Sequence, residues 1–314
     1  MREIYLFEAV SPFRLDLTVW TLRRRPDNRV DRWDGTTYQR VLLLEDIPVQ
    51  ISVSQVGEAW DPKIQVAVTY HQTLSDLQSR IHETLDRMLG LKVDLTDFYS
   101  LADRDPRLRS LARYFRGIKP PRYPSVFEAL INAIACQQIT LTVGIQLLNR
   151  LVENSGRSFD PEIEDDFAFP LARDLLALEP ETLRRLGFSR QKSTAMLQLA
   201  AAVVQGQIQL EELSVLENDQ AFKILTGLRG IGRWSADYTL LRGLGRLDVF
   251  PSGDVGARKS LSNWLGSSDE LDDAGLKKAL EVWQPYTGLV YSHLLLRGLS
   301  EKGLLPMPEE RNAF

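Results

Sequence analysis

Apolar and polar residues alternate in three runs within the first hundred residues, which is the pattern of half-buried β-strands. The runs are Phe13 to Trp20, Ile47 to Val53 and Ile64 to Tyr70. A different spacing follows between Leu74 and Leu89, where apolar residues recur every three or four positions, as on one face of a helix. Gly90 comes next and suits the C-cap of that helix. These patterns predict antiparallel strands with one face covered by a helix.

The strand signal disappears near residue 100, and helical spacing replaces it. Ser125 and Glu128 form the sequence pattern of a capping box, which predicts a helix start. Residues 152–170 are polar and acidic and are expected to form a loop. The fold class is therefore α+β overall, with an N-terminal antiparallel β-sheet domain over 1–99 and an all-α region over 100–314. Further helices are expected at 181–186, 191–204, 218–226, 233–244, 255–265, 273–283 and 286–300.

The stretch Leu228-Arg229-Gly230-Ile231-Gly232-Arg233 lies between two of these helices. Glycines at 230 and 232 allow positive φ and a close approach of another molecule to the backbone. Amides in the turn and in the first turn of the next helix lack intrahelical acceptors, and they lie at the positive end of a helix dipole. Such an arrangement binds anions, phosphate above all, although a lone Gly-x-Gly also occurs as a plain helix connection.

Asp254 is the sharpest candidate for chemistry, because it follows Gly232 by 22 residues, just beyond the helix that the glycine turn opens. Its simpler interpretation is a helix N-cap. Trp234 and Tyr238 share a face of that helix and suit either core packing or the wall of a pocket for a planar base. Gln137 and Gln138 interrupt an apolar stretch, either at a hydrogen-bonded helix junction or as side chains that enter DNA.

Composition restricts the alternatives. The 314 residues carry a net charge of −4, yet the segment from Lys223 to Lys259 holds seven Lys and Arg against three Asp, a local charge of +4. This is compatible with a DNA footprint and equally with a solvated helix surface. Cys136 is the only cysteine, which excludes disulfides, cysteine-ligated zinc and iron–sulfur clusters. No apolar run approaches membrane-spanning length and the N-terminus lacks a signal pattern, so a cytoplasmic, nucleoid-associated protein without a membrane partner is expected.

The stretch from Leu228 to Ala236, with Asp254 at its spacing and Ala135-Cys136-Gln137-Gln138-Ile139-Thr140 upstream, resembles the helix-hairpin-helix DNA glycosylase superfamily. The resemblance is strongest to the alkylation-repair branch of bacterial 3-methyladenine DNA glycosylase II and covers about residues 100–300. It implies a monofunctional glycosylase that flips damaged, alkylated purines out of duplex DNA and hydrolyses the N-glycosidic bond. It also implies two helical subdomains with the hairpin at 226–236 and the active-site cleft between them.

Several residue roles are implied by this resemblance. Asp254 would be the catalytic carboxylate, and Trp234 and Tyr238 would form the base pocket. The DNA-binding positions would be Gln137, Gln138 and Ile139 near the wedge, with Arg229, Gly230, Gly232 and Arg233 in the hairpin. No cofactor is expected to be required, but a monovalent cation could bind the backbone carbonyls of Thr226, Leu228 and Ile231.

The sequence departs from the family pattern in three places. Relatives that also cut the strand carry a lysine where this chain has Trp234. Leu295 stands where the branch often has another aromatic pocket residue, and the wedge site is polar. A non-catalytic DNA-binding protein, a lyase for oxidised purines and a glycosylase for deaminated bases are the alternatives; a small-molecule enzyme has no supporting motif. The expected partner is damaged duplex DNA, bound by a monomer.

Overall fold

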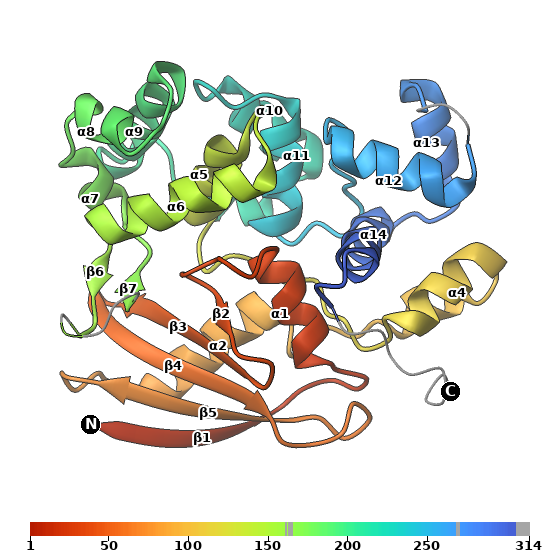
Figure 1. Cartoon of the computed structure of the whole chain (residues 1–314), viewed down its shortest axis with the longest axis horizontal. Helices are drawn as coiled ribbons and strands as arrows, with labels where there is room; N and C mark the ends of the chain where they lie inside the picture. Colours follow the sequence, from red (N-terminus) through yellow and green to blue (C-terminus); the bar gives the residue numbers. More distant parts are fainter. Residues whose placement is uncertain (161, 163–165, 268–270, 306–314) are drawn as a thin grey trace.

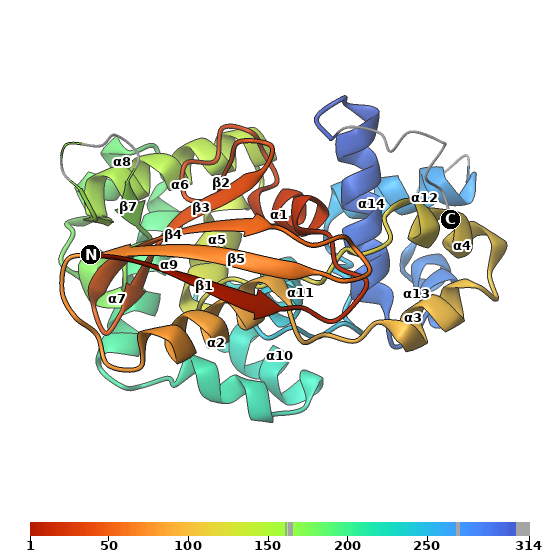
Figure 2. The same cartoon turned by 90° about the horizontal axis from the view of Figure 1, so that it is seen from below.

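A twisted β-sheet forms one end of the molecule, and a larger group of helices stands on one of its faces (Figure 1). The computed structural model describes residues 1–160, 162, 166–267 and 271–305. Seen from below, the strands lie in front of the helices (Figure 2). Along the strand Lys63–Tyr70, buried residues alternate with exposed or half-buried ones. This alternation confirms a sheet with one covered face.

The sheet has seven strands in the order β1-β5-β4-β3-β7-β6, and β2 pairs with β3 outside that path. All pairs are antiparallel except β3 and β7. The strands predicted at 47–53 and 64–70 are confirmed as β4 and β5. The strand bounds are β1 Arg2–Glu8, β2 Arg32–Trp33, β3 Thr37–Leu44, β4 Ile47–Gln55, β5 Lys63–Tyr70, β6 Arg157–Ser158 and β7 Phe167–Ala168.

The region predicted as a loop at 152–170 is only partly a loop. Helix α6 (Leu141–Ser155) extends into it, and β6 and β7 form a short hairpin that continues the sheet. Residues 161 and 163–165 of this region lie outside the described residues. The β7 contact with β3 consists of the single pair Ala168 and Val41, so it depends on the path of the chain after α6 rather than on a periodic pattern.

The strand predicted between Phe13 and Trp20 is wrong, because this segment forms helix α1 (Leu15–Arg23). Leu15, Val19 and Leu22 lie at helical spacing and join the core beneath the sheet. Leu17 and Trp20 lie on the other side of the same helix and join the core of the C-terminal helices. A helix buried on two sides has apolar residues at both sets of positions, and here they imitate the alternation of a strand.

Strand β3 did not show in the sequence pattern because a charged residue occupies an inward-facing position. Arg40 is 1% exposed; its Nη1 donates to Asp31 Oδ1 at 2.6 Å, and its Nη2 donates to both Glu128 oxygens at 2.6 Å. The Tyr38 hydroxyl completes the cluster with a 2.8 Å bond to Asp31. Because Glu128 lies in helix α5 (Val126–Cys136), this cluster joins the sheet to the helical part of the chain.

Because Glu128 binds Arg40, only one half of the predicted capping box is formed. Ser125 Oγ does accept from the Glu128 amide at 3.1 Å, as an N-cap should. The Glu128 side chain, however, binds Arg40 instead of the Ser125 amide. A tertiary ion pair therefore replaces the second half of the local motif.

The later helices lie where the periodicity predicts them, and Gly90 closes α2 with φ +65° as expected. The division between domains at residues 99 and 100 stays a prediction. The bounds of the remaining helices are α2 Leu77–Leu89, α3 Thr96–Ala102, α4 Pro106–Tyr114, α7 Ala172–Leu176, α8 Pro180–Arg185, α9 Arg190–Val204, the 3₁₀ helix η1 Leu210–Val215, α10 Asn218–Gly227, α11 Arg233–Arg242, α12 Val255–Leu265, α13 Asp273–Glu281 and α14 Thr287–Glu301.

We expect Arg40→Met to destabilise the protein by about 3–5 kcal/mol, because it leaves two buried carboxylates without their cation. Urea unfolding followed by circular dichroism measures the free energy of unfolding. Arg297→Ala is the matched control, since Arg297 pairs with Glu301 at the surface and its loss should change stability by less than about 0.5 kcal/mol. Equal stability of Arg40→Met and the unaltered protein would contradict the role assigned to the buried cluster.

Candidate active site

The turn between α10 and α11 is built around Gly230, whose φ is +79°. A Cβ at this position would lie 2.6 Å from the Ala195 Cβ of α9, so both conformation and space require glycine here. Gly232 differs from the expectation of positive φ, since it has φ −92° and ψ −177°, an extended conformation open to any residue. A Cβ on Gly232 would have nothing within 4 Å, and this glycine is exposed. Its backbone is therefore accessible to another molecule.

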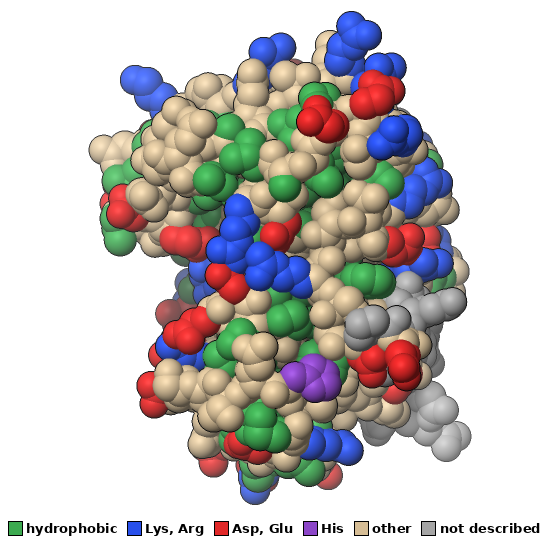
Figure 3. All heavy atoms as spheres, turned by 90° about the vertical axis from the view of Figure 1, so that its left-hand side faces the viewer, with side chains coloured by type: hydrophobic (Ala, Val, Ile, Leu, Met, Phe, Trp, Pro, Cys, Tyr) green, Lys and Arg blue, Asp and Glu red, His purple; other side chains and the backbone are tan. Residues whose placement is uncertain are grey.

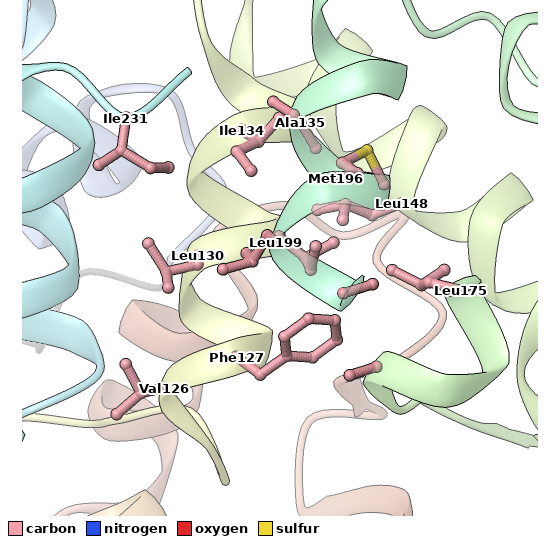
Figure 4. Close-up of a cluster of buried hydrophobic side chains, with 14 of the residues drawn as sticks. Val126, Phe127, Leu130, Ile134, Ala135, Leu148, Leu175, Met196, Leu199 and Ile231 are labelled. Atoms are coloured by element: carbon pink, nitrogen blue, oxygen red, sulfur yellow. The ribbon is translucent and has the colours of Figure 1, made fainter. Parts of the chain in front are cut away.

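Ile231, between the two glycines, anchors the turn in the protein interior. It is 5% exposed and belongs to the apolar core around α5, α6 and α9. Figure 4 shows its side chain on the side of α5 that carries Leu130 and Ile134. The first intrahelical acceptor of α11 is the Gly232 carbonyl, which accepts from the Ala236 amide at 3.0 Å. The preceding amides of this helix start have no intrahelical acceptor and are suited to an anion.

The two glutamines of the α5–α6 junction have different environments. Gln137 Nε2 donates to the Gly230 carbonyl at 2.7 Å and to Ser235 Oγ at 2.8 Å, so this side chain holds the turn in place. Gln138 is exposed and has φ +54°, a strained value for a residue other than glycine. Ile139 beside it is 38% exposed. The structure therefore distinguishes a structural Gln137 from a projecting pair, Gln138 and Ile139.

Asp254 is the N-cap of α12, and it is also held by the helix that the glycine turn opens. Its Oδ1 accepts from the Ala257 amide at 2.9 Å, and its Oδ2 accepts from Trp234 Nε1 at 3.1 Å. The two interpretations of this residue are thus compatible, because capping orients the carboxylate without enclosing it: the residue remains partly exposed. The arrangement presents a fixed negative charge beside an aromatic ring.

The loop that delivers Asp254 lies very close to α11. A Cβ on Gly253 would come within 3.0–3.3 Å of the Cβ, Cα and N of Trp234, so a side chain at this position would press on the start of α11. Ser252 Oγ donates to Asp237 Oδ2 at 3.2 Å from the same loop. Burial raises the pKa of the Asp237 carboxyl. These contacts fix the direction from which Asp254 approaches Trp234.

Trp234 and Tyr238 stack with ring centroids 5.5 Å apart and an interplanar angle of 29°. Trp234 is partly exposed, whereas Tyr238 is 3% exposed and shares a 2.8 Å hydroxyl–hydroxyl bond with Tyr123. Trp234 therefore offers the accessible surface of the predicted pair and Tyr238 supports it from the interior. Their role in a base pocket, and the predicted cleft beside them, stay predictions.

Two residues near this pair were not recognised in the sequence. The guanidinium carbon of Arg24 lies 5.8 Å from the Tyr238 ring centroid and 6.0 Å from that of Tyr123. Tyr291 of α14 is 9% exposed, and the Asp254 carboxylate contributes to a raised pKa of its phenol, after the larger effect of burial. The only sequence signal for Arg24 was the run of three arginines at the end of an apolar segment.

Fewer basic side chains of residues 223–259 are available at the surface than the sequence alone suggests. Arg229 and Arg233 are exposed at the turn as expected, but Arg242 is 2% exposed. Arg258 pairs with Asp273 at 2.7 Å. Elsewhere, on the face that carries α7 and α8, acidic and basic side chains intermingle (Figure 3). The turn is therefore a small basic site on an acidic protein.

The carbonyls proposed for a monovalent cation lie around the same turn. Thr226 is in the last turn of α10, where carbonyls lack intrahelical partners. The Leu228 carbonyl accepts from the Ile231 amide at 3.1 Å and retains a second lone pair. Neutral oxygens of this kind fit a hard monovalent ion. The described residues contain no group of three or more His, Cys, Asp or Glu that could hold a metal.

We expect Gly230→Ala to destabilise the protein by about 1–3 kcal/mol, because the new Cβ meets Ala195 and strains a positive-φ position. Gly232→Ala should change stability by less than about 0.5 kcal/mol, since its conformation and surroundings accept a methyl group. Thermal or urea unfolding of the two variants measures the difference. Equal destabilisation of both would show that the turn has a different conformation.

The sequence and the fold were compared with those of known proteins. Residues 131–285 match the model of the family described as HhH-GPD superfamily base excision DNA repair protein. The DNA-3-methyladenine glycosylase of Bacillus subtilis (strain 168) is 34% identical over 211 residues, which cover 66% of this chain and 68% of that protein. None of the described helices combines the length and apolarity needed to cross a membrane.

Two solved structures have the same fold. The 3-methyladenine DNA glycosylase of Archaeoglobus fulgidus superposes with a TM-score of 0.80 at 24% identity, over 93% of this chain and 97% of that one. The Schizosaccharomyces pombe 3-methyladenine DNA glycosylase, solved in complex with abasic DNA, has a TM-score of 0.56 at 24% identity and covers 64% of this chain and 95% of that one. On the family match and the relative from Bacillus, this chain belongs to the HhH-GPD superfamily of base excision DNA repair proteins.

Proposed function

We propose that this protein is a monofunctional DNA glycosylase, which hydrolyses the N-glycosidic bond of alkylated purines in duplex DNA as the first step of base excision repair. The observation that carries this proposal is the position of Asp254, capping α12 and bonded to Trp234 at the start of the hairpin helix. The name of the Bacillus subtilis relative supports the reaction and the class of lesion. The Schizosaccharomyces pombe structure with abasic DNA supports duplex DNA as the partner.

In the proposed reaction the bond between C1′ of the sugar and the base nitrogen breaks, and its electron pair leaves with the base. The sugar becomes cationic, and the fixed Asp254 carboxylate stabilises this charge. A water oxygen then bonds to C1′, and a proton of that water is released to the solvent or the departing base. The products are the free base and an abasic site. Trp234 Nε1 and the Ala257 amide hold the carboxylate in direction throughout.

DNA would be held mainly through its phosphates. The free amides at the start of α11, the accessible backbone of Gly232 and the exposed Arg229 and Arg233 provide donors and positive charge at one turn. Because these contacts release counterions, the affinity should fall as salt is added. A monovalent cation on the carbonyls of Thr226, Leu228 and Ile231 would add positive charge beside the phosphate; no further cofactor is proposed.

The base would be flipped out of the helix and placed near Trp234, with Tyr238 supporting that ring from behind. An alkylated purine that carries positive charge is attracted to the electron-rich face of an indole. Gln138 and Ile139 project from the α5–α6 junction and are our candidates for the residues that fill the gap in the duplex. Gln137 is assigned instead to the support of the hairpin.

The alternatives are weaker on specific grounds. A non-catalytic hairpin protein would need Asp254 only as the N-cap of α12 and would not need its second carboxylate oxygen held by Trp234 Nε1. A lyase for oxidised purines needs an amine nucleophile, and Trp234 occupies its family position. A glycosylase for deaminated bases would use the same reaction and differ only in its pocket. We further propose that the protein acts as a monomer in the cytoplasm, associated with the nucleoid.

Asp254→Asn should lower the rate of base release by a factor of at least about 10²–10³ while DNA binding is kept, because Asn still caps α12 but has no charge. The measurement is mass spectrometry of bases released from methylated genomic DNA. Asp272→Asn is the matched control, since Asp272 caps α13 through a 2.7 Å bond from the Gly275 amide and lies outside the site. Unchanged turnover by Asp254→Asn would overturn the assignment.

Borohydride added during turnover should trap no covalent adduct between this protein and DNA, because a Schiff base requires an amine at the position of Trp234. The assay is gel electrophoresis of labelled duplex after reduction, with a known glycosylase/lyase run in parallel. A trapped adduct would restore the lyase alternative and identify another amine as the nucleophile.

A further inference from the structure

The N-terminal part of the chain contributes a buried cation to the proposed base pocket. Arg24 follows the last residue of α1 and closes this helix with φ +62°, while its amide bonds the Trp20 carbonyl at 3.0 Å. The residue is 5% exposed, and its guanidinium carbon lies 5.8 Å from the ring centroid of Tyr238. Tyr238 in turn stacks on Trp234, whose Nε1 bonds Asp254. Arg24 is thus joined to the catalytic carboxylate through two aromatic rings.

The Arg24 guanidinium is bonded to a neutral side chain. Its Nη2 donates to Asn132 Oδ1 at 2.9 Å, and its Nε has no hydrogen-bond acceptor among the described residues. Within the part of the chain that the structure describes, no Asp or Glu lies within ion-pair distance of it. Buried guanidinium groups are ordinarily paired with a carboxylate. A buried guanidinium that is bonded only to a neutral side chain, beside a proposed active site, therefore indicates a functional role.

A second buried guanidinium reinforces this local charge. Arg242, at the end of α11, lies 5.5 Å from the Tyr123 ring centroid, and its Nη1 donates to the Thr21 carbonyl at 3.0 Å. Its Nε and Nη2 also lack acceptors. Two buried cations therefore lie against the Tyr123–Tyr238 pair, whereas Asp254 is bonded to Trp234.

We propose that Arg24 is a specificity-determining residue of the base pocket, which shifts selectivity away from cationic bases and toward neutral ones by acting through the Tyr238 ring. This inference rests on the proposed glycosylase function. Arg24 does not touch the base in this arrangement, so it acts as a positioning and electrostatic residue and not as a catalytic one.

The direction of the effect depends on the charge that the base carries before and after the glycosidic bond breaks. When a neutral base leaves, the electron pair of the broken bond makes it anionic, and a nearby fixed cation stabilises that charge. When an alkylated, cationic base leaves, the same pair neutralises it, so the cation helps less and repels the base while it binds. The guanidinium also occupies the π-system of Tyr238 and so weakens its attraction for a second cation.

The experiment compares kcat/KM for release of 7-methylguanine, a cationic base, and of hypoxanthine, a neutral one, from matched duplexes. Arg24→Gln should raise the ratio of methylated to neutral substrate by roughly tenfold, the scale of one charge acting across about 10 Å at an effective dielectric constant of 20. For 7-methylguanine the KM should fall, because the repulsion during binding is gone. Arg24→Lys keeps the charge and should retain a ratio near that of the unaltered protein.

Arg23→Gln is the control for structural damage. Arg23 precedes Arg24 in the chain and is 4% exposed. It donates to the carbonyls of Arg25, Pro26 and Trp33. Its guanidinium lies over Trp20, whereas that of Arg24 lies over Tyr123 and Tyr238. Its replacement should lower stability without changing the ratio. If Arg24→Gln does not fold, Arg24→Met is measured instead; it also removes the charge while keeping a long side chain, and it should move the ratio in the same direction by a similar factor.

The possible results separate the two proposals. No release of either base by the unaltered protein overturns the proposed function itself. Release by the unaltered protein together with an unchanged ratio in Arg24→Gln, or in Arg24→Met when the first variant is unfolded, overturns the role of Arg24 alone. An equal shift in Arg23→Gln also overturns it, since the effect would then come from general destabilisation.

Discussion

The hydrogen bond from Trp234 Nε1 to Asp254 Oδ2 depends on almost every other feature of the site. Trp234 is placed by a turn that only glycine at 230 permits and that Ile231 anchors in the core. Asp254 is placed by a loop packed so closely on α11 that a Cβ at residue 253 would lie 3.0–3.3 Å from Trp234. Neither helix alone determines the geometry. The carboxylate and the indole meet because two separate segments are each held by tight packing.

Gln137 links this constraint to the α5–α6 junction, where the proposed DNA contacts lie. By donating to both the Gly230 carbonyl and Ser235 Oγ, it ties the end of α5 to both sides of the turn. The next residue, Gln138, is thereby forced into a strained conformation and out toward solvent. One side chain thus holds the glycine turn, and its neighbour in the chain projects to solvent close to that turn. In the proposed complex a single duplex would contact both.

The sequence could predict which residues come together around the glycine turn because their signals are local. The glycine turn, the one-turn spacing of Trp234 and Tyr238 and the N-cap pattern at Asp254 are all encoded within a few residues. The errors occur where tertiary contacts decide. α1 imitates a strand because it is buried on two sides, and β3 was missed because Arg40 interrupts its apolar alternation. Positive φ at Gly232 was wrong since Gly230 alone makes the reversal.

Arg24 could not be found in the sequence for a related reason. A run of three arginines at a helix end is typical of a solvated surface. Only the fold shows that Arg24 has different surroundings from Arg23 and Arg25. Arg23 donates to carbonyls of the following loop and of Trp33 in β2, while Arg25 donates to Thr142 Oγ1 of α6. Local sequence gives all three the same description, and the packing of α1 against α2 and α14 places Arg24 beside the rings of Tyr123 and Tyr238.

The N-terminal sheet is therefore part of the site's construction and not a separate attachment. Arg40 joins it to α5 through Glu128, and the Asn149 side chain of α6 bonds the Asp27 carbonyl and the Arg29 amide. α5 and α6 are the two helices that flank Gln138, so the sheet determines where the projecting residues lie. The same segment carries Arg24, whose guanidinium lies over the Tyr238 ring. In the proposed function the hairpin and the carboxylate serve DNA binding and bond cleavage, whereas the proposed influence on the choice of base comes from the buried charge of this additional part of the chain.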